Sequence, residues 1–354
     1  MKSYSLSEVL LRNSEIFTDK RVVITGDVPD AQCLQLLKNS AKATVILDNY
    51  VVAAEMAALM GQRLGRTLSE KAAYKHIEVC FSPIERIVEE LSETEVLVLF
   101  LNKSKQQTLK LLNLLQQTLV PKAEIFILGQ NQGGGKSADS ILKRFGQVAK
   151  FDSARKCTLY RGIYEKTNKL ETRNNPVDAE LLGHKLHFLQ DEAVFSNGRI
   201  DEGTAMLLES MAEVPAQGSL LDLGCGCGVI GITLAKAGFL DVTSVDVSAQ
   251  ALALTERNAR ENGVELKIMP SDMLTGLGSF DVIAVNPPFH QGINTTTGAT
   301  RNMILHAPEH LNKGGAMYLV GNSFLGYERI LRDAFEKVEI LKGNSRFTVF
   351  KAQK

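Results

Sequence analysis

Hydrophobic residues fall along this chain in short runs that alternate with longer amphipathic stretches. The second half contains six such apolar runs, at residues 219–223, 241–247, 265–269, 280–286, 315–320 and 346–352. Helical patterns occupy the stretches between them, and the pattern from Ala249 to Asn262 is followed by Gly263, a typical helix stop. Short β-rich runs that alternate with helices are typical of an α/β fold around a largely parallel sheet.

The first half repeats this rhythm, with apolar runs at residues 21–27, 43–49, 95–102, 123–129 and 157–162. The first two runs start 22 residues apart in both halves, at 21 and 43 and again at 219 and 241. We interpret the repeat as an internal duplication, which disfavours one large α/β domain. The prediction is two tandem domains, residues 1–165 and 184–354, joined by a polar linker at residues 166–183.

Composition and charge limit the classes of function. The chain has 354 residues, of which 44% are hydrophobic, enough for two domains that each bury a core. Forty basic and forty acidic residues give a formal net charge of zero, so a polyanionic partner must be met by a local basic patch. No apolar run approaches the ~20 residues that cross a bilayer. Five scattered cysteines and an N-terminus without a signal-peptide pattern lead us to expect a cytoplasmic protein with reduced thiols.

A glycine-rich loop follows the run at 219–223 and opens a helical pattern. Gly224, Gly226 and Gly228 let a ligand approach the backbone, and the N–H groups at the helix start point at its polar end. Asp246 lies 20 residues after Gly226 and ends the next run, where a carboxylate accepts both hydroxyl groups of a ribose. The pattern predicts a nucleoside-containing cofactor.

Two cofactors compete for this loop. The spacing Gly226-x-Gly228-x-x-Gly231 also satisfies the dinucleotide fingerprint, so an NAD-dependent oxidoreductase stays an alternative. Asp222, just before the loop, would repel a pyrophosphate and suits a ligand that carries an ammonium and a sulfonium. Asp272 follows the third run with Met273 beside it, and its carboxylate is placed to accept from an adenine amino group. We therefore favour S-adenosylmethionine.

The tetrapeptide Asn286-Pro287-Pro288-Phe289 ends the fourth run, and His290 follows it. Its two prolines fix the chain direction, so that the Asn286 side-chain oxygen and the Pro287 carbonyl can face one planar amine, on whose ring Phe289 stacks. Acceptors on both N–H bonds of an aryl amine favour the positive charge that grows on nitrogen during methyl transfer. We predict that the tetrapeptide is catalytic, that Asn286 also borders the cofactor, and that His290 accepts a proton or contacts RNA.

Two further patterns resemble functional motifs but lack residues that those motifs require. Cys225 with Cys227, and His306 with His310, lack the additional ligands of a metal site, so we expect no metal. The segment from Gly129 to Ser137 resembles a phosphate-binding loop, but five residues, and not four, separate its first glycine from Gly-Lys-Ser. A nucleoside triphosphatase is therefore not expected.

Taken together, these motifs resemble the class I methyltransferases that carry the amine-methylating Asn-Pro-Pro-Phe signature. The whole chain is similar to the bacterial small-subunit ribosomal RNA guanine-N2 methyltransferases of subfamily C, in the segments SEVLLRNSE, DSARKCTLYRG, VFSNGRIDEGTAMLL, LDLGCGCGV, NPPFHQG and SFLGYERIL. The resemblance implies two tandem Rossmann-like class I methyltransferase domains, an N-terminal degenerate copy and a C-terminal catalytic copy. In agreement, Thr25-Gly26-Asp27 replaces the glycine loop in the first half, and Leu101-Asn102-Lys103-Ser104 replaces the tetrapeptide.

The same resemblance implies a substrate and further site residues. The substrate would be a guanine 2-amino group of 16S ribosomal RNA in assembled small subunits; a sister family that modifies large-subunit RNA is the nearest alternative, and an RNA-binding module with two inert halves is another. Phe195 and Ser196 would lie against the cofactor or the target base, with Asp201 and Gly203 in the lid of the site. We expect a monomer that contacts RNA through a basic stretch, Lys143, Arg144, Lys150, Arg155, Lys156 and Arg161.

Overall fold

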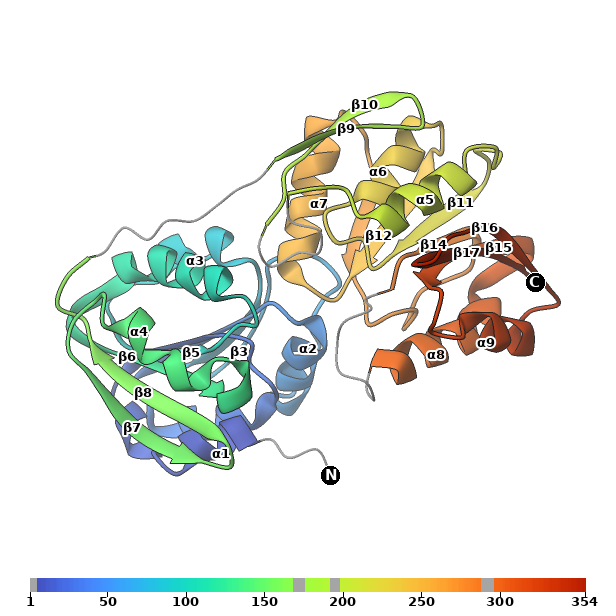
Figure 1. The fold of residues 1–354 in the computed structure, drawn as a ribbon. Helices are drawn as coiled ribbons and strands as arrows, with labels where there is room; N and C mark the ends of the chain where they lie inside the picture. Colours follow the sequence, from blue (N-terminus) through green and yellow to red (C-terminus); the bar gives the residue numbers. More distant parts are fainter. Residues whose placement is uncertain (1–4, 168–175, 192–197, 288–295) are drawn as a thin grey trace. The chain divides into compact units, whose positions relative to one another are not determined.

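The computed structural model describes residues 5–167, 176–191, 198–287 and 296–354. The chain divides into two compact units, Met1–Arg173 and Asn174–Lys354, which we name the first and the second domain (Figure 1). Within the described part of the chain, none of the helices combines the length and the apolar character that spanning a lipid bilayer requires.

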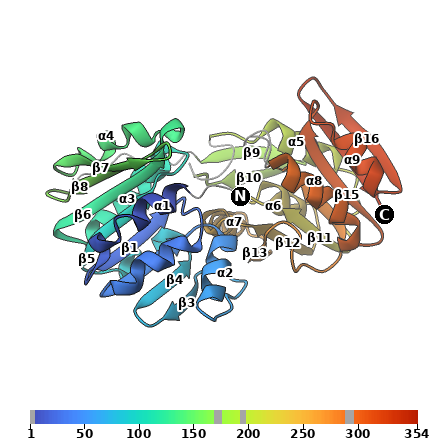
Figure 2. The same ribbon diagram turned by 90° about the horizontal axis from the view of Figure 1, so that it is seen from below.

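The described residues of the first domain form an eight-stranded mixed sheet in the order β3-β4-β2-β1-β5-β6-β8-β7 (Figures 1 and 2). Strands β4, β2, β1, β5 and β6 are parallel, and β3, β8 and β7 each pair antiparallel with a neighbour. The strands are β1 (Arg21–Gly26), β2 (Lys42–Leu47), β3 (Glu70–Tyr74), β4 (Ile77–Phe81), β5 (Thr94–Phe100), β6 (Leu119–Gln130), β7 (Val148–Ala154) and β8 (Cys157–Ile163). The helices are α1 (Ser5–Leu11), α2 (Tyr50–Leu59), α3 (Lys105–Leu115) and α4 (Asp139–Leu142).

The described part of the second domain has a seven-stranded sheet in the order β13-β12-β11-β14-β15-β17-β16, with a separate hairpin of β9 and β10. Its strands are β9 (Val177–Leu181), β10 (His184–Phe188), β11 (Ser219–Leu223), β12 (Asp241–Asp246), β13 (Lys267–Pro270), β14 (Phe280–Val285), β15 (Leu311–Asn322), β16 (Lys337–Gly343) and β17 (Phe347–Gln353). Its helices are α5 (Glu202–Ser210), α6 (Val229–Lys236), α7 (Ala249–Glu261), α8 (Thr296–His306) and α9 (Tyr327–Ala334).

The two sheets share one topology. When the extra edge strand β3 is set aside, the order β4-β2-β1-β5-β6-β8-β7 corresponds strand by strand to β13-β12-β11-β14-β15-β17-β16. In both sheets the strand next to the far edge reverses direction against the parallel strands. The correspondence confirms the internal duplication and the two-domain α/β fold.

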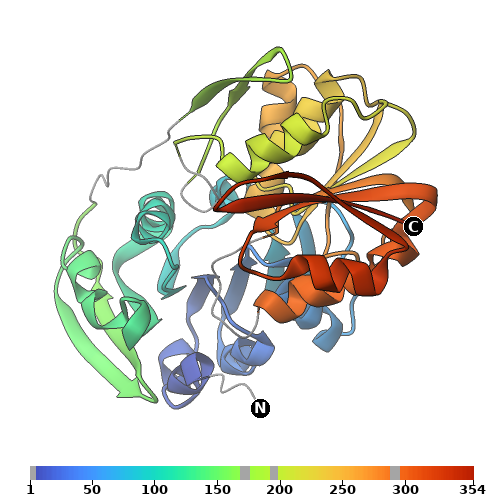
Figure 3. The ribbon, with the colours of Figure 1, turned by 45° about the vertical axis from the view of Figure 1, so that its right-hand side comes forward.

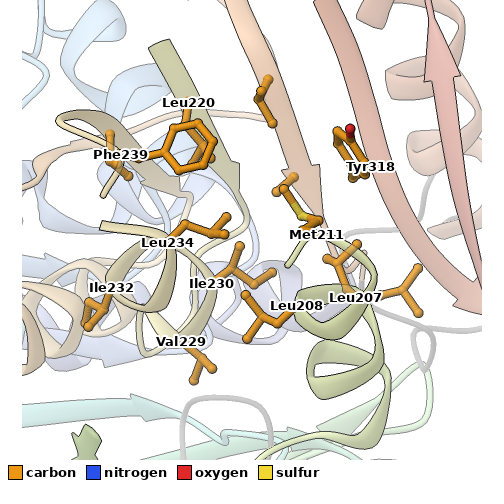
Figure 4. Close-up of a cluster of buried hydrophobic side chains, with 14 of the residues drawn as sticks. Leu207, Leu208, Met211, Leu220, Val229, Ile230, Ile232, Leu234, Phe239 and Tyr318 are labelled. Carbon is orange, nitrogen blue, oxygen red and sulfur yellow. The ribbon is translucent and has the colours of Figure 1, made fainter. Parts of the chain in front are cut away.

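Alternating residues of the second sheet face two separate cores. Leu220 packs with residues of α5 and α6 in the cluster shown in Figure 4, whereas its neighbour Leu221 packs with residues of α8 and α9. These two pairs of helices lie on opposite faces of the sheet (Figure 3). Side chains of successive strand residues point to opposite faces, so a strand with helices on both sides reads as a continuous apolar run. Because both faces are covered, the strand ends are the part of the sheet that can hold a ligand.

The predicted linker at residues 166–183 is wrong at its C-terminal end. Val177–Leu181 forms β9, which pairs antiparallel with β10. Leu182 and Gly183 between them have φ of 49° and 78°, the left-handed conformation that a two-residue hairpin turn requires. The residues of β9 and of the turn contain no continuous apolar run, so their sequence resembles that of the polar linker, whereas β10 lies within the predicted second domain.

Candidate active site

A cavity of about 350 Å³ lies at the carboxyl edge of the second domain's sheet. Four neighbouring strands end at it: β13 before Asp272 and Met273, β12 at Asp246, β11 before Gly224–Gly226, and β14 before Asn286 and Pro287. Open α/β folds bind their ligands in the crevice at this edge, and the volume is in the usual range of small-molecule sites. Asp201 also lines the cavity, so the structure brings together eight of the predicted site residues.

Asp246 ties the glycine loop to β12. Its Oδ2 accepts a hydrogen bond from the Gly226 N–H at 3.0 Å, and its Oδ1 accepts from the Ser248 N–H at 3.0 Å. Burial raises the pKa of the Asp246 carboxyl, while these backbone N–H groups oppose the rise. A carboxylate has about four acceptor positions. The carboxylate therefore retains acceptor capacity for the hydroxyl groups of a ribose.

Met273 has a left-handed backbone with φ of 50°, which is uncommon for a residue other than glycine. The Ser271 hydroxyl donates to the Met273 carbonyl at 2.8 Å and holds this turn. The turn carries Asp272 at the cavity rim, where its carboxylate is exposed. Residues held in sparsely populated conformations cluster at ligand sites, and this one fits that pattern.

Asp222 and Gly228 lie behind the cavity wall and are not among the residues that line it, so their role in cofactor binding stays a prediction. Asp222 shares its strand face with Leu220, so its fully buried side chain points under α6, where Oδ2 accepts from the Gly231 N–H at 2.9 Å. Gly228, with φ of 85°, begins α6, and a Cβ there would lie 2.9 Å from side-chain atoms of Ile232 and Thr255. Both residues hold the loop in place.

The pKa of Asp222 leads to a prediction about pH. Burial is the main cause that raises this pKa from 3.8 to about 7. The folded protein then binds the proton more tightly than the unfolded chain does, so this group destabilises the fold increasingly as pH rises from about 4 to about 7. We expect Asp222→Asn to gain stability over the wild type by up to about 4 kcal/mol across this interval, and no more above it, in denaturant titrations at several pH values.

Asp281→Asn is the matched control for that experiment. Hydrogen bonds, chiefly from the Ser219 backbone N–H, lower the pKa of Asp281. The contribution of Asp281 to the free energy of unfolding is therefore constant above about pH 5. Its substitution should change that free energy by the same amount at pH 5 and pH 8. A pH-independent difference between Asp222→Asn and the wild type would contradict the assigned burial of a titrating carboxyl.

The side-chain amide of Asn286 is hydrogen-bonded through its nitrogen, whereas its oxygen has no partner among the described residues. Its Nδ2 donates to Asp201 Oδ2 at 2.9 Å and to Thr204 Oγ1 at 2.8 Å. Its Oδ1 is buried and accepts no hydrogen bond from any described residue. A buried acceptor without a donor costs free energy, so its presence beside a cavity indicates a ligand that donates. This is the acceptor that the sequence predicted for an amine.

Several predicted residues lie outside the described residues: Phe195, Ser196, Pro288, Phe289 and His290. Conversely, the cavity wall includes residues that the sequence did not single out: Gln190, Arg199, Ile200, Thr204 and Ser248. Thr204 accepts a hydrogen bond from Asn286, which lies 82 residues further along the chain. Asp201 caps α5, and Asp is a residue type that is strongly preferred at this position, so a helix start is the one local signal that the sequence offers here.

The predicted basic stretch of the first domain is partly neutralised. Lys143 pairs with Asp139, Arg155 with Glu8, and Arg161 with Glu124. Lys150 and Lys156 are exposed on and next to β7. A role of this stretch in RNA binding stays a prediction, with fewer available charges than the sequence indicated.

The cysteines of the glycine loop are protonated at neutral pH. Burial raises the pKa of the Cys225 thiol well above its usual range and that of Cys227 to about 12. Metal ligation requires the thiolate. His306 and His310 each place Nδ1 against a backbone carbonyl oxygen, and the described residues contain no group of three or more His, Cys, Asp or Glu side chains arranged for a metal ion.

The charge of the cavity wall distinguishes between the two cofactors. Among its described residues are three aspartates, Asp201, Asp246 and Asp272, against one arginine, Arg199. Such a wall suits the ammonium and sulfonium of S-adenosylmethionine and disfavours the pyrophosphate of NAD. The acceptors left on Asp246 and the orphan Asn286 Oδ1 fit a ribose and a target amine. Fold and cavity together define a class I methyltransferase.

Comparisons with known proteins narrow this class. Residues 7–175 match the family model "Methyltransferase small domain N-terminal", and residues 185–351 match "Methyltransferase small domain". Ribosomal RNA small subunit methyltransferase C of Vibrio cholerae is 30% identical over 353 residues, 98% of each chain. The protein of the same name from Aeromonas hydrophila is 33% identical over 352 residues, 98% of this chain and 97% of that one. The chain belongs to the ribosomal RNA small subunit methyltransferase C family.

A solved structure agrees with the fold. The T. thermophilus 16S rRNA N2 G1207 methyltransferase, in complex with AdoMet and guanosine, superposes with a TM-score of 0.83 at 21% identity, over 100% of this chain and 92% of that chain. The agreement over the full length confirms the two-domain α/β methyltransferase fold that the sequence predicted.

Proposed function

We propose that this protein transfers a methyl group from S-adenosylmethionine to the exocyclic 2-amino group of guanine 1207 of 16S ribosomal RNA, the position named for the T. thermophilus protein. The buried Asn286 Oδ1, an acceptor at the cavity that has no donor among the described residues, is the observation that carries the proposal. The names of the relatives support a small-subunit RNA as substrate over the large-subunit RNA of the sister family. We propose the assembled small subunit in the cytoplasm as the target, and a monomeric enzyme.

The second domain would hold the cofactor. Asp246 would accept from its ribose hydroxyl groups, Asp272 from its adenine amine, and the Gly224–Gly226 loop would border its polar end. When bound, S-adenosylmethionine supplies a methyl group activated by the positive charge of its sulfonium.

The chain's own residues address the amine. The lone pair of an aryl amine is delocalised into the ring, so the nitrogen is a poor nucleophile. Asn286 Oδ1 and the Pro287 carbonyl accept from its two N–H groups and stabilise the positive charge that grows as the N–C bond forms and the S–C bond breaks. The methylated nitrogen then loses one proton, and no strong base is required because the cationic amine is acidic.

In the first domain, the asparagine that corresponds to Asn286 is hydrogen-bonded to a neighbouring strand end. Asn102, just after β5, occupies the place that Asn286 has after β14, and its Nδ2 donates to Asp27 Oδ1 at 2.9 Å. A Cβ at Gly26 would lie 2.0 Å from the Phe100 carbonyl oxygen, so the two strand ends meet closely. We infer that this domain binds no cofactor and contributes affinity for RNA.

Charge reversal of Lys150 and Lys156 tests that contribution. If each meets a phosphate, the double Glu variant should bind small subunits more weakly, and its slope of log K against log salt should be flatter by about one to two. Reversal of Lys38 and Lys42, two exposed lysines elsewhere in the same domain, is the control and should change neither quantity. Equal salt slopes for the Lys150/Lys156 variant and the wild type would contradict the assignment.

The proposed function itself is tested with labelled S-adenosylmethionine and three substrates purified from cells that lack the protein: small subunits, free 16S RNA and large subunits. We expect label in the 16S RNA of small subunits, as 2-methylguanosine at one position. Label in large subunits would instead support the sister activity. No transfer to any of the three, small subunits, free 16S RNA or large subunits, would contradict the proposal.

A further inference from the structure

We propose that Asp201 and Thr204 are positioning residues, which fix the side-chain amide of Asn286 so that its Oδ1 faces the amine of the target guanine. The inference rests on the proposed function, because the amine is the donor that Oδ1 would receive. Whether Oδ1 can act as the acceptor depends on the orientation of the Asn286 amide. We assign that orientation to Asp201, the cap of α5, and to Thr204 within α5.

Both hydrogens of the Asn286 amide nitrogen are committed to this pair. One is donated to Asp201 Oδ2 and the other to Thr204 Oγ1. The Thr204 hydroxyl lies 3.4 Å from the same Asp201 Oδ2 and is placed to donate to it. An ionised carboxylate only accepts hydrogen bonds, so a flipped amide would place its oxygen against the Asp201 carboxylate. The opposite orientation, with Oδ1 turned away from α5, is thereby selected.

The pair is itself held rigidly. Asp201 Oδ2 accepts from the Thr204 backbone N–H at 2.9 Å, which caps α5. A Cβ on Gly203 would lie 3.0 Å from Asp201 Oδ2 and 3.2 Å from the ring of Phe347, so the absence of a side chain there lets the helix start approach β17. Leu207 and Leu208, one turn on, are buried in the core of Figure 4.

Asp201 also acts on the electronic character of the amide. A carboxylate that accepts from Nδ2 draws positive charge toward the nitrogen side of the amide and leaves more negative charge on Oδ1. A more negative acceptor stabilises the cationic amine of the transition state more than the neutral amine of the ground state, which raises kcat and not only affinity. Asp201 and Thr204 therefore differ in role: both orient the amide, and Asp201 adds charge.

Binding of guanosine and inosine tests the orientation without any turnover. Inosine lacks the 2-amino group, so the wild type should bind guanosine more tightly, and Thr204→Val, which keeps the shape but removes the hydroxyl, should lose most of this preference. In methyl transfer to small subunits the same variant should lower kcat about tenfold with KM changed less than about threefold. Thr204→Ser restores the hydroxyl and should restore both quantities.

Two further variants test Asp201 and separate folding from positioning. Asp201→Asn replaces an acceptor-only carboxylate by an amide that also donates, so a flipped Asn286 amide is no longer disfavoured, and both the guanosine preference and kcat should fall. Asp201→Ala also removes the cap of a helix, which by itself lowers stability. Asn49→Ala is the matched control, because it removes the cap of α2 in the first domain. The control should lower Tm and leave the preference for guanosine intact. Full preference and full kcat in Thr204→Val would overturn the inference alone, whereas a wild type without any preference would overturn the proposed function and this inference with it.

Discussion

Replacement of Asn286 by alanine is expected to abolish methyl transfer while the affinity for S-adenosylmethionine stays nearly unchanged. The substitution removes no hydrogen bond to the glycine loop or to Asp246. The Asn286 Oδ1 that it removes is the acceptor that we assign to the amine. Loss of one preorganised group that stabilises transition-state charge costs a factor of about 10² to 10³ in rate. The measurement is single-turnover transfer to small subunits, with cofactor binding by calorimetry on the same preparation.

Asn102→Ala is the matched control, because Asn102 follows the corresponding strand of the first domain and bonds to Asp27 there. This variant should transfer methyl groups at close to the wild-type rate. An Asn286→Ala enzyme that retains more than about a tenth of the wild-type rate would show that the amine is held by other groups.

Replacement of Asp246 by alanine should weaken S-adenosylmethionine binding by more than about tenfold, since hydrogen bonds to a charged acceptor contribute about 1.5–3 kcal/mol each. The substitution also releases the Gly226 N–H that Oδ2 accepts, so the loop loses its tie to β12. Asp48→Ala, just after the corresponding strand β2 of the first domain, should leave the affinity unchanged. An unchanged Kd in Asp246→Ala would mean that the nucleoside lies elsewhere.

Each of the eleven apolar runs coincides with a strand of the structure, because continuous apolar runs are what a covered parallel sheet requires. The short strand β4 was missed although it is largely buried, because Glu78 interrupts its apolar residues. The other missed strands, β3, β7, β16 and the β9–β10 hairpin, have mostly exposed or half-buried residues. Their strand pairing is set by neighbours in space, and their own composition resembles that of loops.

The same limit applies to the site. Asp246, Asp272 and Asn286 were each assigned to the site from their place at the end of an apolar run, and the ends of parallel strands meet at one edge of a sheet. The direction of a side chain at such an end is a tertiary property: Asp222, one strand position before Leu223, points under α6 and not into the cavity. Thr204 was missed because its contact with Asn286 joins a helix start to a distant strand end.

The most direct test of the central claim is mass mapping of ribosomal RNA from cells that lack this protein. We expect one methyl group to be missing from the 16S fragment that contains guanine 1207, to return with the wild-type gene, and to stay missing with Asn286→Ala. A fully methylated 16S fragment, with or without a methyl group missing from the large-subunit RNA, would contradict the assignment.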